Sequence, residues 1–348
     1  MIQRRTLVQG AAAAAATLGA PLAAFGQQTV TLKFHTFMAP MSNVWLTMHK
    51  PWMDKVEKDS GGRIKFEAFP AMQLGGTPPQ LYDQVRDGVA DVIWTLPGNN
   101  GGRFPRVEVF ELPFMMNNAE ATSKAYWEYF QTQAPDEFKE THVLAVQVHG
   151  PGVIHSVDKP VRSAADLRGM KVRGPTRLVT RMLASLGATP VGMPLPGIPD
   201  ALSKGTIDGA VIPWEVVPSV KVHELTKFHS EFPADMPALY TTTFVMAMNK
   251  ARYDSLPADL KRVVDANSGM ATSAFLGRTQ QSNDPNGRKS ASDRGNTIHT
   301  FTKAEAEDFI KRSSAIDDEW VADMDKRGFK GAQLLSSAKA LIAKHGRG

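Results

Sequence analysis

The sequence predicts an α/β protein with two similar lobes, and three observations lead to this expectation. Residues 29–96 alternate between strand-like and helix-like segments, which is typical of an α/β layer with mostly parallel strands. Residues 170–213 repeat this alternation. The two units also share a motif, in which a helix end, a glycine, two residues and an aspartate precede an apolar strand.

The first unit is expected to contain three strands and two helices. Its segments, in the order strand, helix, strand, helix, strand, are residues 29–37, 42–59, 64–70, 78–88 and 90–96. The strands are rich in β-forming residues, and the first helix has apolar residues at helical spacing. Gly61-Gly62 ends the first helix and Gly88 ends the second.

The second unit is expected to follow the same order, and the chain from about residue 257 is expected to be helical. The segments of the unit are a strand at Lys171 and Val172, a helix at 176–186, a strand at 188–195, a short helix ending at Gly205 and a strand at 206–213. The later helices are expected at 256–281, 303–324 and 332–344, with an interruption at DPNGR, 284–288. We expect these long helices to brace the two lobes.

The shared motif aligns QVRDGVADVIWTL with ALSKGTIDGAVIP, so that Gly88 matches Gly205 and Asp91 matches Asp208. A glycine suits a helix end that needs positive φ. Two independent helix-to-strand turns would also produce this pattern, because such turns are common. We interpret the match as two similar α/β units whose strand ends face a shared crevice, where open α/β sheets usually bind ligands.

The first 26 residues resemble an export signal of twin-arginine type. Arg4-Arg5 precedes an alanine-rich apolar run, and Ala24-Phe25-Gly26 resembles a small-x-small cleavage site. An N-terminal membrane anchor is the alternative, but the run is short and weakly hydrophobic for a span. We therefore expect cleavage after Gly26 and a mature protein that works outside the cytoplasm.

Composition and motifs argue against several classes of function. The chain has no cysteine, which removes disulfides, thiol catalysis and cysteine-bound metals. Its net charge is +5, a weak indication of anionic ligands, and no basic run carries interleaved aromatic residues, so nucleic acid is not an expected partner. G-x-S-x-G, P-loop and H-E-x-x-H motifs are absent, which lowers the expectation of an enzyme.

Arg173 is the strongest candidate for a binding residue. It ends a short strand, where open α/β sheets bind ligands, and its guanidinium can hold a carboxylate with two hydrogen bonds. Gly174 permits a sharp turn, and Pro175 suits the first turn of the helix that follows. A surface arginine on a loop would show the same spacing, and spacing alone supports the two interpretations equally.

Aromatic and histidine residues give weaker indications. Trp214 and Glu215 follow the last strand of the second unit, and Trp94 holds the matching place in the first. Aromatic residues beside a crevice would form an apolar wall. The alternative is that both tryptophans pack in the core and that the glutamate is exposed to solvent. His35 and His155 lack metal-ligand spacing, so we interpret them as polar or hydrogen-bonding residues.

Five segments together resemble the periplasmic substrate-binding subunits of tripartite ATP-independent periplasmic (TRAP) transporters, the DctP-like family. They are IKFEAFPAMQLGG (64–76), LYDQVRDGVADVIW (81–94), ADLRGMKVRGP (165–175), LGATPVGMPL (186–195) and LSKGTIDGAVIPWE (202–215). The resemblance extends over nearly all of the chain after residue 26. It implies a two-lobed periplasmic binding-protein fold, a long helix that crosses both lobes, and an organic acid bound between the lobes.

The resemblance also implies roles for particular residues. The signature arginine of the family follows L-x-G-x-K, and Arg173 holds that position, so it is expected to clamp a carboxylate. Val153 and Ile212 replace polar residues of sialic-acid-binding members, which argues against sialic acid. Glu215 matches the glutamate of a Trp-Glu pair in keto-acid-binding relatives, so a monovalent or divalent cation held with the ligand is an open alternative. No other cofactor is expected.

We therefore expect a periplasmic receptor that delivers a carboxylate to the membrane subunits of a TRAP transporter. An aromatic or branched monocarboxylate is the expected ligand, and closure of two hinged lobes would bury it. The expected site consists of Arg173 as the clamp, Trp94, Trp214 and Phe37 as apolar walls, Glu215, and His35, His155, Tyr240 and Thr241 as polar contacts.

The expected lobes are discontinuous in sequence, and two other functions stay open. Lobe I is expected at 29–150 with about 240–275, and lobe II at 151–239 with part of the helices at about 290–345. A periplasmic sensory receptor would use the same fold and the same Arg173. A periplasmic enzyme acting on small acids is less favoured, because the sequence shows no nucleophile–base pair.

Overall fold

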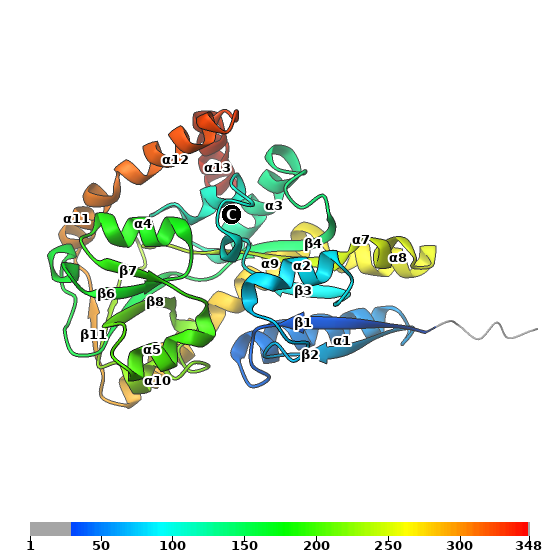
Figure 1. Ribbon diagram of the computed structural model, residues 1–348, viewed down its shortest axis with the longest axis horizontal. Helices are drawn as coiled ribbons and strands as arrows, with labels where there is room; N and C mark the ends of the chain where they lie inside the picture. Colours follow the sequence, from blue (N-terminus) through cyan, green and yellow to red (C-terminus); the bar gives the residue numbers. More distant parts are fainter. Residues whose placement is uncertain (1–28, 347–348) are drawn as a thin grey trace, which may run out of the picture.

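A computed structural model describes residues 29–346 of the protein. The export signal expected at residues 1–26 lies outside this described part. Within it, no helix combines the length and the apolar character needed to cross a membrane. The chain forms two α/β lobes side by side, each built on its own sheet (Figure 1). The expected two-lobed fold class is confirmed.

Lobe I contains a five-stranded sheet in the order β2-β1-β3-β10-β4. Its strands are β1 (Val30–Thr36), β2 (Ile64–Phe69), β3 (Val92–Thr95), β4 (Thr141–Val148) and β10 (Thr243–Asn249). β1 pairs in parallel with β2 and β3, and β10 runs antiparallel to β3 and β4. β1, β2 and β3 lie within the three strands expected from the sequence.

Lobe II contains a six-stranded sheet in the order β11-β9-β5-β8-β6-β7. Its strands are β5 (Gly152–Ser156), β6 (Lys171–Gly174), β7 (Thr189–Gly192), β8 (Gly209–Pro213), β9 (Phe228–Glu231) and β11 (Thr297–Thr300). β6 pairs in parallel with β7 and β8, and β5 runs antiparallel to β8. Three parallel strands with one antiparallel neighbour therefore recur in both lobes.

The shared sequence motif has the same structure in both lobes. Asp91 Oδ2 accepts a hydrogen bond of 2.8 Å from the backbone N–H of Lys33 on β1, and Asp208 Oδ2 accepts one of 2.8 Å from that of Lys171 on β6. The glycine three residues before each aspartate has positive φ, +77° and +64°. Each aspartate ties the start of one strand to its parallel neighbour, so the predicted likeness of the two units is confirmed.

Helices cover both sheets and link the lobes (Figure 1). They are α1 (Lys50–Asp59), α2 (Leu81–Arg86), α3 (Ala119–Gln133), α4 (Arg177–Ser185), α5 (Ile198–Ser203), α6 (Val222–Leu225), α7 (Lys250–Asp254), α8 (Ala258–Ala266), α9 (Gly269–Ser282), α10 (Asp284–Asp293), α11 (Lys303–Ser313), α12 (Ala315–Lys326) and α13 (Gly331–His345). Two short 3₁₀ segments also matter for the site, η4 (Val107–Glu111) and η7 (Trp214–Val216).

The helix expected to cross both lobes is formed by α9 and α10, which follow each other with only Asn283 between them. α9 packs against α3 and β4 of lobe I, and α10 packs against η7 of lobe II. DPNGR, expected as an interruption, forms the first turns of α10 instead. Pro285 is tolerated there because a proline in the first turn of a helix loses no internal hydrogen bond.

Two helices expected to be continuous are divided in the structure. The segment 256–281 forms α8 and α9, because Gly269 has a φ of +83°, outside the α-helical region. The segment 303–324 forms α11 and α12, which meet at Ser314. Apolar residues continue at helical spacing across both junctions, so periodicity alone does not reveal them.

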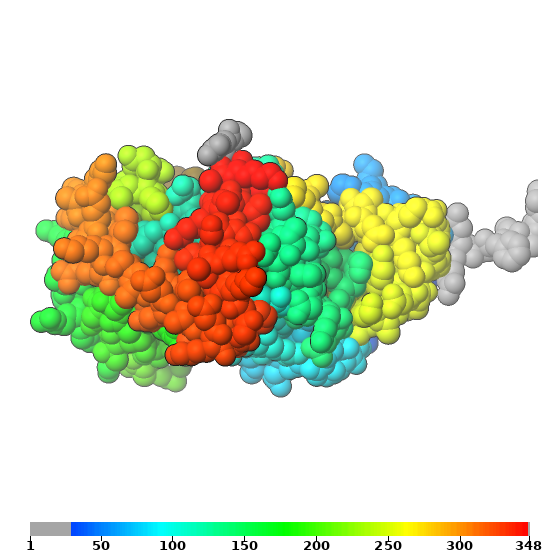
Figure 2. Space-filling model, turned by 90° about the horizontal axis from the view of Figure 1, so that it is seen from above, coloured from blue at the N-terminus to red at the C-terminus, as the bar shows by residue number. Residues whose placement is uncertain are grey.

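The C-terminal helices α11–α13 form a belt over both lobes (Figure 2). α11 and α12 pack against α4 of lobe II, and α13 packs against α3 of lobe I. Arg177 on α4 forms ion pairs with Asp323 on α12 and with Glu108 on η4 of lobe I. This arginine therefore joins both lobes and the belt at one point.

The close approach of α9 to α3 predicts that Gly277→Ala destabilises the protein. A Cβ at Gly277 would overlap with Oγ of Ser123 and with the carbonyl group of Ala119, both on α3. We expect urea denaturation to show a free energy of unfolding that is lower by about 1–3 kcal/mol. Gly197→Ala is the control, because a Cβ there meets only Met193 Sδ at 3.5 Å. Equal losses in both variants would contradict the packing argument.

Candidate functional site

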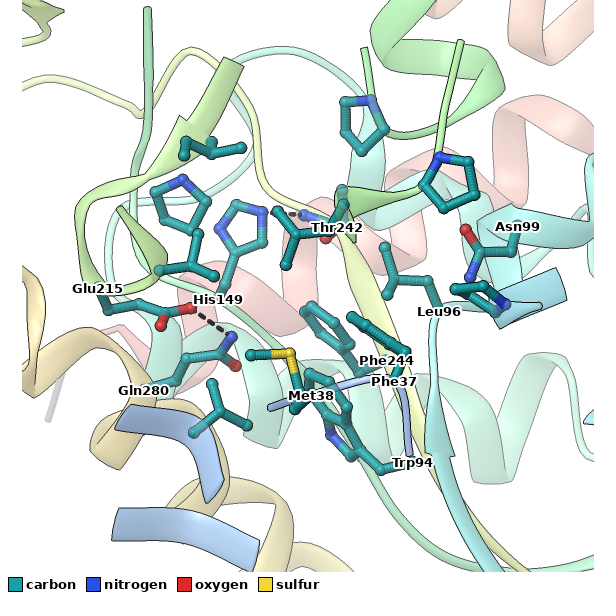
Figure 3. Close-up of a pocket in the computed structure, with 18 of the residues that line it drawn as sticks. Phe37, Met38, Trp94, Leu96, Asn99, His149, Glu215, Thr242, Phe244 and Gln280 are labelled. Carbon is teal, nitrogen blue, oxygen red and sulfur yellow. Dashed lines mark hydrogen bonds between the residues drawn. The ribbon is translucent and has the colours of Figure 1, made fainter. Parts of the chain in front are cut away.

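A cavity of about 510 Å³, its mouth included, lies between the two lobes (Figure 3). Most of its lining comes from residues at or just after the carboxyl ends of β1, β3, β6, β7 and β8, together with β10, α9 and the connections between the lobes. The strand ends of the two units therefore face one cavity, as the sequence predicts.

The lobe I wall of the cavity is a stack of three aromatic rings (Figure 3). Phe37 follows β1, Trp94 lies on β3 and Phe244 lies on β10, so the pairing of neighbouring strands brings the three together. The ring centroids of Trp94 and Phe244 are 4.3 Å apart with planes 10° from parallel, and Phe37 stacks on Trp94 at 5.5 Å. The stack offers an apolar surface for the body of a ligand.

Arg173 reaches the cavity from lobe II with its charge uncompensated. Only 4 % of the residue is exposed, and it donates hydrogen bonds to the carbonyl oxygens of Met193 (Nε, 2.9 Å) and Val211 (Nη1, 3.1 Å). Among residues 29–346 no carboxylate pairs with it, and besides burial only Tyr240 affects its pKa. Burial lowers the pKa of Arg173 to about 10, so it stays charged at neutral pH. Such a cation favours an anionic ligand.

Glu215 and Asp284 bring two carboxyl groups together beside the cavity. Glu215 lines the cavity from η7 and is 2 % exposed, and its backbone N–H donates a hydrogen bond of 3.0 Å to Asp284 Oδ1 at the start of α10. Burial raises the pKa of Glu215 to about 8, and the neighbouring Asp284 adds to this effect. Burial of the Asp284 carboxyl group raises its pKa to about 8 as well. The neutral forms are therefore favoured at pH 7.

A series of hydrogen bonds, which we call the donor chain, links the aromatic wall to Glu215. Trp94 Nε1 donates to Gln147 Oε1 at 3.2 Å, Gln147 Nε2 donates to Gln280 Oε1 at 3.2 Å, and Gln280 Nε2 donates to Glu215 Oε1 at 2.7 Å. An indole N–H can only donate, so it sets the orientation of both amides. The donor chain thus runs in one direction, from lobe I through α9 to lobe II.

Two segments cross between the lobes beside the cavity, residues 149–151 and 232–242. His149 Nε2 accepts a hydrogen bond of 3.1 Å from the N–H of Thr242, and Thr241 Oγ1 donates one of 2.8 Å to the His149 carbonyl. Burial lowers the pKa of His149 to about 4, so its ring is neutral. His149 therefore fastens the two crossing segments together, where a hinge between the lobes would bend.

Five of the nine residues predicted for the site line the cavity. They are Phe37, Trp94, Arg173, Glu215 and Tyr240. They come from both lobes and from one crossing segment, so the fold brings together side chains that are far apart in sequence. Their roles toward a ligand stay predictions.

Two of the other four, Trp214 and His155, pack in lobe II behind the cavity. Trp214 Nε1 donates a hydrogen bond of 2.8 Å to Glu231 on β9, and its ring packs against His155 at 5.1 Å. His155 is hydrogen-bonded to the carbonyl of Ile212 at 3.1 Å. Because Trp214 and Glu215 are neighbours in a tight turn, only Glu215 faces the cavity.

The remaining two, His35 and Thr241, also lie outside the lining. His35 is buried on β1 next to Gln84 of α2, and burial lowers its pKa. Successive strand residues point to opposite faces, so its position at the strand end does not direct it to the cavity. The hydroxyl of Thr241 donates its hydrogen bond to the carbonyl oxygen of His149, in the other crossing segment.

The cavity also contains polar residues that the sequence did not single out for binding. Asn99 lines it from the loop after β3, and its Nδ2 is buried without a hydrogen-bond partner within residues 29–346. A loop at the carboxyl end of a parallel strand is a usual place for ligand contacts, and this signal was available in the sequence. The sequence contains no such indication for Gln280, which lies in a helix, or for His149, which lies in a crossing segment.

The described residues contain no group of three or more His, Cys, Asp or Glu side chains that could hold a metal ion. Glu215 is the one acidic residue of the lining, and Gln280 occupies one of its oxygens. A cation held with the ligand stays a prediction. The lining has no serine, cysteine or lysine. A cavity between two lobes, with a buried guanidinium and an aromatic wall, is the arrangement of a solute-binding protein.

Comparison with known proteins agrees with this class. Residues 35–323 match DctP, the bacterial extracellular solute-binding protein, family 7. The chain belongs to this family, and it is a periplasmic solute-binding subunit of the TRAP type, a class whose members bind small organic acids and act with TRAP membrane subunits.

Three solved structures are particularly informative relatives. A TRAP solute-binding protein from Rhodoferax ferrireducens T118, in complex with copurified benzoate, is 67 % identical, with a TM-score of 0.91 over 92 % of this chain and 99 % of that one. A marine metagenome protein specific for aromatic acid ligands, in complex with 3-hydroxybenzoate, is 49 % identical, with a TM-score of 0.90 over 91 % of this chain and 99 % of that one. A Bordetella bronchiseptica protein with bound mandelate is 26 % identical, with a TM-score of 0.83 over 90 % of this chain and 99 % of that one.

The raised pKa of Glu215 predicts that the ligand-free protein loses stability as the pH rises. Its pKa is about 8 in the folded protein and 4.5 ordinarily, so its stabilising effect is complete below pH 4.5 and is lost as the pH rises through 8. From pH 7 to pH 8 we expect this group to lower the free energy of unfolding by about 1 kcal/mol. Between pH 7 and 8 the histidines of the unfolded chain, with an ordinary pKa of about 6.5, still release some protons, which acts in the opposite direction; the comparison with Glu215→Gln separates the two effects.

Urea denaturation at pH 7 and pH 8 checks this expectation. Glu215→Gln should reduce the loss of stability between the two pH values, and the part that remains would come from Asp284. Glu319→Gln is the matched control, because Glu319 is exposed on α12. The same loss in Glu215→Gln and in the wild type would mean that Glu215 is already ionised in the folded protein at pH 7.

Proposed function

We propose that the protein captures an aromatic monocarboxylate in the periplasm and delivers it to the membrane subunits of a TRAP transporter. The observation that carries this proposal is the uncompensated guanidinium of Arg173 at the cavity. A ligand carboxylate would complete a charge-assisted pair that the protein itself does not provide. Arg173 is then the carboxylate clamp.

The aromatic wall supports an aromatic body for this acid. A planar ring lying against this wall would remove its own apolar surface from water and would add a further aromatic contact to the stack. The relatives bound to benzoate and to 3-hydroxybenzoate are 67 % and 49 % identical to this chain, which supports the same class of ligand here.

The distribution of charge supports one carboxylate rather than two. Arg173 is the one Lys or Arg side chain in the lining, which the structure describes completely, and burial keeps His149 neutral. A second carboxylate would lie against apolar rings or near Glu215 without a cation to balance it. Burying an unpaired charge costs several kcal/mol, so a dicarboxylate is disfavoured.

Two further parts of the proposal concern the export of the protein and its docking on membrane subunits. The twin-arginine-type segment supports export of the folded chain, with cleavage after Gly26. The family supports docking of the closed, loaded protein on membrane subunits, which then receive the acid.

A thermal-shift titration with benzoate tests the clamp. Ligand that binds only the folded protein raises its melting temperature, so the wild type should be stabilised in proportion to occupancy. Arg173→Ala should weaken binding by about 100-fold or more, because it removes the one partner of a desolvated carboxylate. Arg173→Lys should recover part of the affinity, since it keeps the charge but not the two-pronged geometry.

Arg168→Ala is the control for a general loss of positive charge, because Arg168 is exposed outside the cavity. It should bind benzoate like the wild type. Equal stabilisation of the wild type and of Arg173→Ala would contradict the clamp. No stabilisation of the wild type by any aromatic or aliphatic monocarboxylate would overturn the proposed function itself.

A further inference from the structure

The donor chain ends at a carboxyl group that, in the described part of the protein, has one oxygen without a partner. Glu215 Oε1 accepts the hydrogen bond from Gln280, whereas Glu215 Oε2 is buried and has no hydrogen-bond partner within residues 29–346. A buried carboxyl oxygen without a partner is costly, because it loses its hydrogen bonds to water. Figure 3 shows Glu215 and Gln280 together at one side of the cavity, with the aromatic rings between them and Asn99.

Rearrangement of the neighbouring amides cannot supply the missing partner. The indole N–H of Trp94 occupies Gln147 Oε1, and the amide of Gln147 occupies Gln280 Oε1. Flipping Gln280 would place two donors against each other and would take the donor away from Glu215 Oε1. The polarity of the donor chain therefore keeps Oε2 as the end that is free for a ligand.

The free oxygen does not belong to the carboxylate clamp. Glu215 and Arg173 form no ion pair, and neither is among the groups that shift the pKa of the other. Burial raises the pKa of Tyr240, Arg173 lowers it, and Glu111 and Glu215 add to the rise. Arg173, Tyr240 and Glu215 all line the same cavity, and Arg173 and Glu215 are separate groups within it.

We propose that Glu215 and Gln280 form a second recognition point, which takes a hydroxyl group on the body of the bound acid. This inference rests on the proposed function, because it assumes an acid held at Arg173. The ligand class it names is a hydroxylated aromatic acid. The hydroxyl would sit at the free Glu215 oxygen, at the end of the donor chain.

A hydroxyl suits this oxygen in either protonation state of Glu215. The protonated carboxyl group, favoured by burial, donates to the hydroxyl oxygen, whereas an ionised carboxylate accepts the hydroxyl proton. A methyl group of similar size does neither and leaves the oxygen unpaired. A site built to hydrogen-bond a hydroxyl discriminates strongly against an analogue without one.

The test compares the binding of four acids by isothermal titration calorimetry at pH 7. The probes are 3-hydroxybenzoate and 4-hydroxybenzoate, each beside the methyl analogue of the same ring position. The wild type should bind at least one hydroxy acid about tenfold more tightly than its methyl analogue, the effect of one buried hydrogen bond. Benzoate is measured in parallel, so that loss of the clamp and loss of the second recognition point are distinguishable.

Two substitutions at one position separate hydrogen bonding from charge. Glu215→Gln keeps both an acceptor for Gln280 and a donor toward the cavity, so the hydroxyl preference should persist. Glu215→Leu keeps a side chain of similar size but removes both polar oxygens, so the preference should disappear while benzoate still binds. Glu319→Gln on the exposed face of α12 should match the wild type.

Three outcomes would overturn the inference. In the first, the wild type binds benzoate but shows no preference for either hydroxy acid. In the second, Glu215→Leu retains the preference, which would place the hydroxyl elsewhere. In the third, the preference is lost in Glu215→Gln and requires added sodium or calcium ions, which would mean that Glu215 holds a cation. Failure of all aromatic acids, benzoate included, would count against the proposed function.

Discussion

The site is governed by the cost of burying one positive charge. The guanidinium of Arg173 is nearly inaccessible to water, and the two carbonyl oxygens that it contacts replace only part of its hydration. Taking a charge out of water costs several kcal/mol unless an opposite charge accompanies it. The closed cleft therefore needs an anion more than it needs any particular shape. With an acid bound as proposed, binding and closure of the lobes would be coupled, because the acid would supply the charge that makes closure favourable.

The polar interior of the protein is organised by a group that can only donate. The indole of Trp94 belongs to the aromatic wall, yet its N–H sets the direction of the amides of Gln147 and Gln280, which end at Glu215. One residue thus takes part in both the apolar and the polar face of the cavity. Since the donor chain passes from lobe I through α9 to lobe II, a ligand that touches either face meets groups whose orientation depends on both lobes.

Local patterns in the sequence predict the six strands of the two repeated units, the shared motif and the position of Arg173, because each depends on residues close together in the chain. They do not predict β4, β5, β9, β10 and β11, which lie outside the repeated units. The cavity-facing role of Glu215 rather than Trp214 depends on how a tight turn is rotated, which composition does not show. Gln280 becomes a site residue only because α9 crosses between the lobes. The divisions within the C-terminal helices escape prediction for a related reason, since backbone angles at single residues such as Gly269 interrupt an unbroken apolar spacing.

The ion pairs of Arg177 would act on a bound solute without touching it. Opening the cleft has to part Arg177 from Glu108 on lobe I, whereas Asp323 lies on the belt and packs with lobe II. The contact lies outside the cavity, so it contributes to the barrier for opening without touching the solute. Two different solutes would meet this same contribution, so the dwell time of each would depend on the lobes as well as on the ligand.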